Sequence, residues 1–296
     1  MIFGVILGFS AALFQSASYI CGRLFSSRFN NNTLELLSLS HIIMAVFSLA
    51  ALPLIIASPM PALSTWILKC AACTIFYLVG QFCLLMALQH ASASRISPLL
   101  GLKVFMLAVI GIAVLNQQFN LIQWLAIALT VFGAYVLSYS GEKLKPAPIL
   151  WVLAACFCFC ISDLNIKLMV HTFEHAGLFK ASFTSACLTY IFCGLVGLAV
   201  LPFLPKPTPA MWLWSAPFAV TWFISMLFLF SCFATIGVVF GNIIQSTRGI
   251  ISVMLGLLIS TLGHVTIEQK VSRSVFLHRL AAATLITAAI ALYCLS

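Results

Sequence analysis

The chain has 296 residues, of which 63% are hydrophobic and only 6% are charged, and its formal net charge is +9. Soluble domains are typically about a quarter charged, so this composition excludes a soluble fold. The basic residues are dispersed along the sequence and therefore give no reason to expect a nucleic-acid partner. We expect a single membrane domain.

Apolar stretches recur along the whole chain, at lengths near the roughly 20 residues that a helix needs to cross a bilayer. In chain order, the predicted spans are residues 2–21, 34–57, 66–89, 95–115, 121–140, 149–170, 178–204, 212–234, 238–262 and 276–295. The first stretch lacks the basic head of a signal peptide, so we expect it to be retained as a span. The sequence therefore predicts an all-α integral membrane protein with ten transmembrane helices.

Basic residues indicate which side of the membrane each loop faces. They gather in the loops that follow the odd-numbered predicted helices and at the adjoining helix ends, as Arg23, Arg28, Arg95, Lys143, Lys145, Lys206, Lys270, Arg273 and Arg279. The positive-inside rule then places these loops in the cytoplasm and both termini outside.

The two halves of the chain resemble each other when one is shifted by about 145 residues. The features that align are Trp66 with Trp212, Lys103 with Arg248, and Gly111 with Gly256. We expect residues 1–141 and 146–296 to be two five-helix repeats of one transmembrane domain. Because five is odd, the second repeat must be inverted in the membrane, a construction found in many secondary transporters.

Two segments carry a resemblance to a known family. The first is "ASASRISPLLGLKVFMLAVIGIAVLNQQFNLIQWLAIALTVFGAYVLSY", residues 91–139, and it recurs more loosely in residues 238–295, where "GHVTIEQ" (Gly263–Gln269) follows the ninth span. These segments resemble the EamA-like branch of the drug/metabolite transporter superfamily, which implies a ten-helix transporter. Two features depart from the family. Its Glu-Pro-like pairs are replaced by Lys103-Val104 and Arg248-Gly249, and its usual cytoplasmic termini conflict with the charge bias.

Two bases lie deep within predicted spans. A charge in the hydrocarbon costs at least about 2.5–3.5 kcal/mol, so such residues are candidates for function. Arg248 is about ten residues into the ninth span, near 15 Å deep at 1.5 Å per residue, and Lys103 is nearly as deep from the other face. Gly241, Gln245, Arg248 and Ser252 share one side of their helix.

These two cations predict a site for an anionic group, because Arg grips carboxylate or phosphate bidentately and Lys adds a point charge. Phosphate translocators of the same superfamily resemble this arrangement, with basic residues on their fourth and ninth transmembrane helices, which correspond to the fourth and ninth spans predicted here. The alternative is that each cation pairs with a helix carbonyl or a neighbouring acid. Other candidate substrate contacts are Gln15, Tyr19, Tyr77, Gln81 and Trp222, any of which could instead bond a neighbouring helix.

Asp163 is the only acid deep in a predicted span. Its spacing from Lys167 is that of an i,i+4 ion pair on one helix face, which is the structural interpretation. The functional interpretation is a protonatable group that couples transport to a proton gradient.

The function predicted is secondary transport, as an exporter or importer, by alternating access across the bacterial inner membrane. We expect the substrate to be a small polar metabolite, anionic or zwitterionic, such as an amino acid or an organic or phosphorylated anion. The alternatives are a flippase for lipid-linked phosphate intermediates and a cationic drug exporter that uses Asp163. The sequence holds no nucleotide-hydrolysis motif and no catalytic or metal constellation, so we expect no enzyme, cofactor or metal. Expected partners are the substrate and the lipid bilayer, with the protein a monomer or homodimer.

Overall fold

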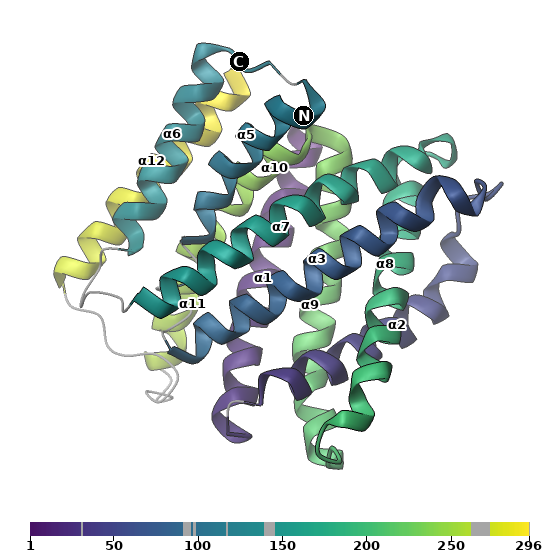
Figure 1. Ribbon diagram of the computed structural model, residues 1–296. Helices are drawn as coiled ribbons and strands as arrows, with labels where there is room; N and C mark the ends of the chain where they lie inside the picture. Colours follow the sequence, from purple (N-terminus) through teal and green to yellow (C-terminus); the bar gives the residue numbers. More distant parts are fainter. Residues whose placement is uncertain are drawn as a thin grey trace.

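The computed structural model describes residues 1–30, 32–90, 96, 99–116, 118–138, 146–261 and 273–295, and these contain helices and no β-strand. The longer helices are α1 (Ile2–Arg28), α2 (Thr33–Ile55), α3 (Leu63–His90), α5 (Lys103–Leu115), α6 (Leu121–Ser138), α7 (Pro146–Thr172), α8 (Leu178–Val200), α9 (Pro209–Ile236), α10 (Val238–Gln245), α11 (Arg248–Thr261) and α12 (Arg273–Leu295). Three short 3-10 helices are η1 (Leu100–Leu102), η2 (Glu174–Ala176) and η3 (Leu201–Phe203). Figure 1 shows them packed as one bundle.

Six helices confirm predicted spans, because α1, α2, α3, α7, α8 and α9 are long and apolar enough to cross a membrane. The chain is therefore a multi-pass membrane protein. The other predicted spans coincide with shorter helices: η1 with α5, then α6, then α10 with α11, and α12. The total of ten spans stays a prediction.

Several sequence predictions fall outside the described residues. They are the boundary between the repeats at residues 141–146, apart from its last residue, the segment Gly263–Gln269, and the loop bases Arg95, Lys143, Lys145 and Lys270.

Apolar side chains cover the outside of the bundle, while polar side chains lie inside it. Leu54 and Phe203 are 85% and 86% exposed, whereas Gln81 and His41 are fully buried. This distribution suits lipid, because apolar surface carries no penalty there and polar groups need partners within the protein. The polar residues of this protein therefore gather in its interior.

The helices of the first half pack against helices of the second half. In the pair α1–α9, Gly4 adjoins Ile236 and Gly22 adjoins Phe218, so the two helices are antiparallel. In the pair α3–α7, the ring of Trp66 contacts that of Phe173 near one end, and the ring of Phe82 contacts that of Trp151 near the other. These two helices are therefore antiparallel as well.

The remaining pairs join helices at corresponding positions of the two halves. α2 lies antiparallel to α8, with Ser38 against Gly197 and the backbone N–H of Ala57 donating to Thr184 Oγ1 at 2.9 Å. α6 packs against α12, and α5 against α10. The start of α1 and the end of α12 lie toward the same end of the bundle (Figure 1).

Candidate functional site

Both buried bases follow a local break in their helices. Lys103 is the first residue of α5 and comes directly after the 3-10 turn η1. Arg248 is the first residue of α11, and a turn with i→i+3 backbone bonds separates it from α10. A 3-10 stretch within a span often marks a hinge or a functional position. The sequence predicted the two bases but not these breaks.

The two breaks lie beside each other, because η1 and α5 both pack against α10. A Cβ placed on Gly101 would lie 3.6 Å from Ser246 Oγ, which is ordinary van der Waals contact. Lys103 and Arg248 each lie two residues beyond this contact on their own helix. Cys156 of α7 interacts electrostatically with both cations. The structure therefore brings Lys103 and Arg248 to one region of the interior.

Lys103 is paired with an acid. Its Nζ donates to Asp163 Oδ2 at 2.8 Å, and the same oxygen accepts from Asn242 Nδ2 at 2.8 Å. The prediction that Asp163 pairs with Lys167 is wrong. Lys103 reaches it from α5, because the packing of α5 on α7 brings the two side chains together. For Lys103, the structure therefore contains the alternative to a free cation, namely a pair with a neighbouring acid.

Arg248 has no acid partner among the described residues. Its side chain is 4% exposed, and one terminal nitrogen donates to Gln15 Oε1 at 2.9 Å. Its backbone oxygen lies 3.1 Å from Ser16 Oγ of α1, whose hydroxyl also donates to Ala12 O at 2.8 Å. The guanidinium Nε makes no hydrogen bond within the described part of the chain. Arg248 therefore carries a buried positive charge that no protein carboxylate in this part of the chain neutralises.

Other buried polar atoms around this break also have no protein partner among the described residues. They are Tyr19 Oη, Asn242 Oδ1 and both polar atoms of the Gln245 side chain. Buried polar groups are nearly always hydrogen-bonded, so unpaired groups of this kind are expected to bind a ligand or water. Ser252 is buried one turn beyond Arg248, on the same face of α11.

The predicted aromatic residues form one cluster. The ring of Trp222 lies 6.1 Å from that of Tyr19 and 6.1 Å from that of Tyr77. Trp222 Nε1 donates to the Tyr190 hydroxyl at 3.0 Å, and the Tyr77 hydroxyl lies 2.9 Å from His41 Nε2. Through Tyr19, this cluster continues to the region of Arg248, with which the phenol interacts electrostatically.

Gln81 is the one predicted contact that the structure does not connect to the cations. It is fully buried on α3, and its side chain makes no hydrogen bond to the described residues.

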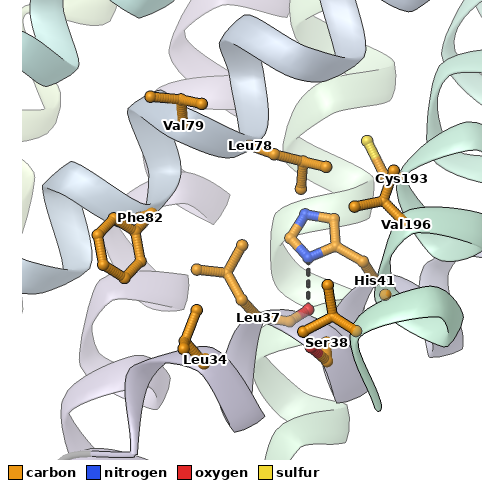
Figure 2. A pocket seen from close by; sticks show the side chains of 11 residues that line it. Leu34, Leu37, Ser38, His41, Leu78, Val79, Phe82, Cys193 and Val196 are labelled. Carbon is orange, nitrogen blue, oxygen red and sulfur yellow. Dashed lines mark hydrogen bonds between the residues drawn. The ribbon is translucent and has the colours of Figure 1, made fainter. Parts of the chain in front are cut away.

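A separate cavity lies between α2, α3 and α8 (Figure 2). It has a volume of about 220 Å³ and a lining that is almost wholly apolar, including Leu37, Leu78 and Val196. None of the predicted site residues lines it. His41 does, and its Nδ1–H donates to Leu37 O at 2.7 Å, which leaves Nε2 to accept from Tyr77. This cavity is unsuited to an anion.

Sequence reasoning missed Ser16, His41, Tyr190 and Asn242. Each lies within a mostly apolar span, and for Ser16, His41 and Tyr190 nothing in the spacing indicates more than an ordinary interhelical contact. Asn242 had the clearest signal, because it lies one turn before Gln245 on the same helix.

The comparisons with known proteins agree with this architecture. A crystal structure described only as that of a protein matches 99% of this chain and 96% of its own chain, with a TM-score of 0.67 and 17% identity. At that identity the likeness establishes the fold alone. No curated protein matches the sequence. The profile of the EamA-like transporter family matches residues 2–139. This match confirms, for residues 2–139, the resemblance to the EamA-like transporter family of the drug/metabolite transporter superfamily that was drawn from the sequence.

Proposed function

We propose that this protein is a secondary transporter of the bacterial inner membrane, with ten spans in two inverted halves, residues 1–141 and 146–296. The helix pairing supports the proposal. Exchanging each helix for its counterpart in the other half turns the pair α1–α9 into α7–α3 and leaves α2–α8 and α6–α12 unchanged. The counterparts α2 and α8 run antiparallel, as inversion requires.

The substrate is a small metabolite with an anionic group, as in an organic anion or a zwitterion. The observation that carries this conclusion is Arg248, a buried guanidinium whose charge no carboxylate within 4.0 Å neutralises in the described part of the chain. An isolated buried charge is costly, and an anion bound to it removes much of that cost. The two cations each follow a short turn with 3-10 geometry, a feature that often marks a hinge or a functional position within a helix.

Each candidate residue except Gln81 has a part in this site. Arg248 binds the anionic group, while Gln15 orients the guanidinium. Gln245, Tyr19 and Ser252 supply uncharged contacts, and Tyr77 and Trp222 form the wall on the side of α3 and α9. Lys103 is the second cation and Asp163 is the protonatable group that couples transport to protons.

A cationic substrate is disfavoured. Its counter-charge would be Asp163, whose Oδ2 already accepts bonds from Lys103 and Asn242 at 2.8 Å each. A lipid-linked phosphate would use the same Arg248, and it is distinguished by the binding experiment below.

The test is a thermal-shift screen of the purified protein against matched anionic, zwitterionic, neutral and cationic metabolites, with short-chain lipid phosphates as a further class. We expect anions or zwitterions to raise the melting temperature, and Arg248→Met to abolish that rise because the anchoring charge is lost. Lys167→Met is the matched control, since it removes a positive charge from a half-buried position on α7.

Stabilisation by cations alone, or an anion response that survives in Arg248→Met, would refute the proposed site. A response confined to the lipid phosphates would replace the metabolite carrier by a flippase.

A further inference from the structure

Lys103 at the start of α5 and Arg248 at the start of α11 are two buried positive charges, and among the described residues only Lys103 has an acid partner. Lys103 and Asp163 form a pair with relative side-chain exposures of 5% and 6%, so together they contribute no net charge. Arg248 is joined to the neutral side chain of Gln15. The region around the two helix breaks therefore offers a ligand one uncompensated positive charge rather than two.

We propose that Asp163 is an internal counter-anion that determines the charge of the substrate, an inference that rests on the proposed function. While Asp163 is ionised, it occupies Lys103, and the site takes a ligand with one negative charge. A dianion requires Lys103 as well as Arg248, so it binds only when Asp163 takes up a proton. Asp163 thereby couples proton uptake to dianions and leaves monoanions uncoupled.

The geometry makes the substrate and Asp163 competitors for the same group. Lys103 reaches Asp163 from the first turn of α5, and Arg248 begins α11 on the other side of the contact between Gly101 and Ser246. A dianion bound at this contact has to take the Lys103 ammonium from the carboxylate. Asn242 holds the carboxylate in place through the same Oδ2.

Protonation releases Lys103 by a simple balance of charge. One proton adds to the Asp163 carboxylate, which becomes a neutral acid, while the Lys103 ammonium keeps its charge, so the net charge rises by one. The groups that interact electrostatically with Asp163 are Lys103 on α5, Cys73 on α3 and Cys160 on α7 itself.

Among the other described elements around α7, η2 carries one acid, Glu174, which is exposed and lies 3.5 Å from His171 rather than near Lys103. α10 presents Asn242, which does not titrate. α8 and α9 contain neither Asp nor Glu, and their buried titratable groups are Cys187, Tyr190, Cys193 and Cys232. Asp163 is thus the carboxyl group that controls Lys103 among the described residues.

The experiment measures binding of ethanesulfonate and ethanedisulfonate to the purified full chain by thermal shift and calorimetry. Sulfonates keep their charges under both mildly alkaline and mildly acidic conditions, so any pH dependence belongs to the protein. For the wild type, we expect ethanesulfonate to bind independently of pH and ethanedisulfonate to bind about tenfold or more tightly in acid. In Asp163→Asn, ethanedisulfonate should bind tightly at both pH values.

The double variant Lys103→Met/Asp163→Asn covers the case in which Asp163→Asn fails to fold, because it removes both charges of the buried pair together. This variant should bind ethanedisulfonate no more tightly in acid than in alkali. A folded double variant that still binds ethanedisulfonate about tenfold more tightly in acid would overturn the inference.

Failure of this inference differs from failure of the proposed function. If ethanesulfonate binds through Arg248 but ethanedisulfonate binds equally well at both pH values, only the role of Asp163 is lost. If neither sulfonate binds to the wild type, the anion site at Arg248 itself is refuted.

Discussion

The buried polar residues of this protein act in small groups, and Asp163 belongs to the tightest of them. Its Oδ2 accepts from Lys103 and Asn242, and the three side chains come from α7, α5 and α10. An ion pair of this kind costs desolvation free energy that the attraction of the partners roughly offsets, whereas a single remaining charge is left without compensation. The stability of the protein should therefore depend on the pair as a unit.

We predict a non-additive effect of removing the two charges. Lys103→Met or Asp163→Asn alone should lower the free energy of unfolding by about 3–5 kcal/mol, because each leaves the partner buried and unpaired. The double variant should lose much less than the sum. Melting temperatures of the four proteins in one detergent provide the measurement, and additive losses would show that the two side chains are not energetically coupled.

The same residues illustrate how far sequence alone can reach. The cost of burying charge identified Lys103, Arg248 and Asp163 correctly as interior residues. The sequence did not identify their partners, because helical spacing relates only residues within one helix. For that reason the spacing predicted Lys167 as the partner of Asp163. The true partner is 60 positions away, on a helix that only tertiary packing brings to α7. Gln15 and Arg248, 233 positions apart, could not be paired for the same reason.

At the scale of helices, close packing of α2 against α8 holds the halves together. Gly194 lies directly against α2, where an added Cβ would overlap Cβ of Ala45 and lie 3.0 Å from the carbonyl oxygen of His41. Only a residue without a side chain allows this approach, and small residues of this kind are typical of helix contacts in membranes. The sequence predicted both helices, but it did not show which glycine faces which helix.

We therefore predict that Gly194→Ala separates α2 from α8 and destabilises the protein by about 1–3 kcal/mol, as overpacking does. The matched control is the adjacent Leu195→Ala, because Leu195 is 56% exposed and faces away from the bundle interior. Melting temperatures of the two variants should differ clearly, with Leu195→Ala close to the wild type. Equal melting temperatures of Gly194→Ala and the wild type would contradict the contact.

At the scale of the whole molecule, apolar length predicted six long helices that the structure contains, and the shorter helices follow the remaining predicted spans. The breaks at Lys103 and Arg248 were beyond prediction, because a 3-10 turn inside an apolar run carries no distinct sequence signal. The two turns, one in each half of the sequence, lie in contact at Gly101 and Ser246, two residues before the buried cations.

The central claim is that a solute crosses the membrane by alternating access through the Arg248 site, and counterflow in proteoliposomes tests it most directly. Vesicles are loaded with the anion that gives the largest thermal shift, diluted, and supplied with a trace of the labelled anion outside. The account predicts transient accumulation of label above equilibrium, which Lys167→Met retains and Arg248→Met loses while still folded. Label that only equilibrates in wild-type vesicles, or accumulation that persists in Arg248→Met, would contradict it.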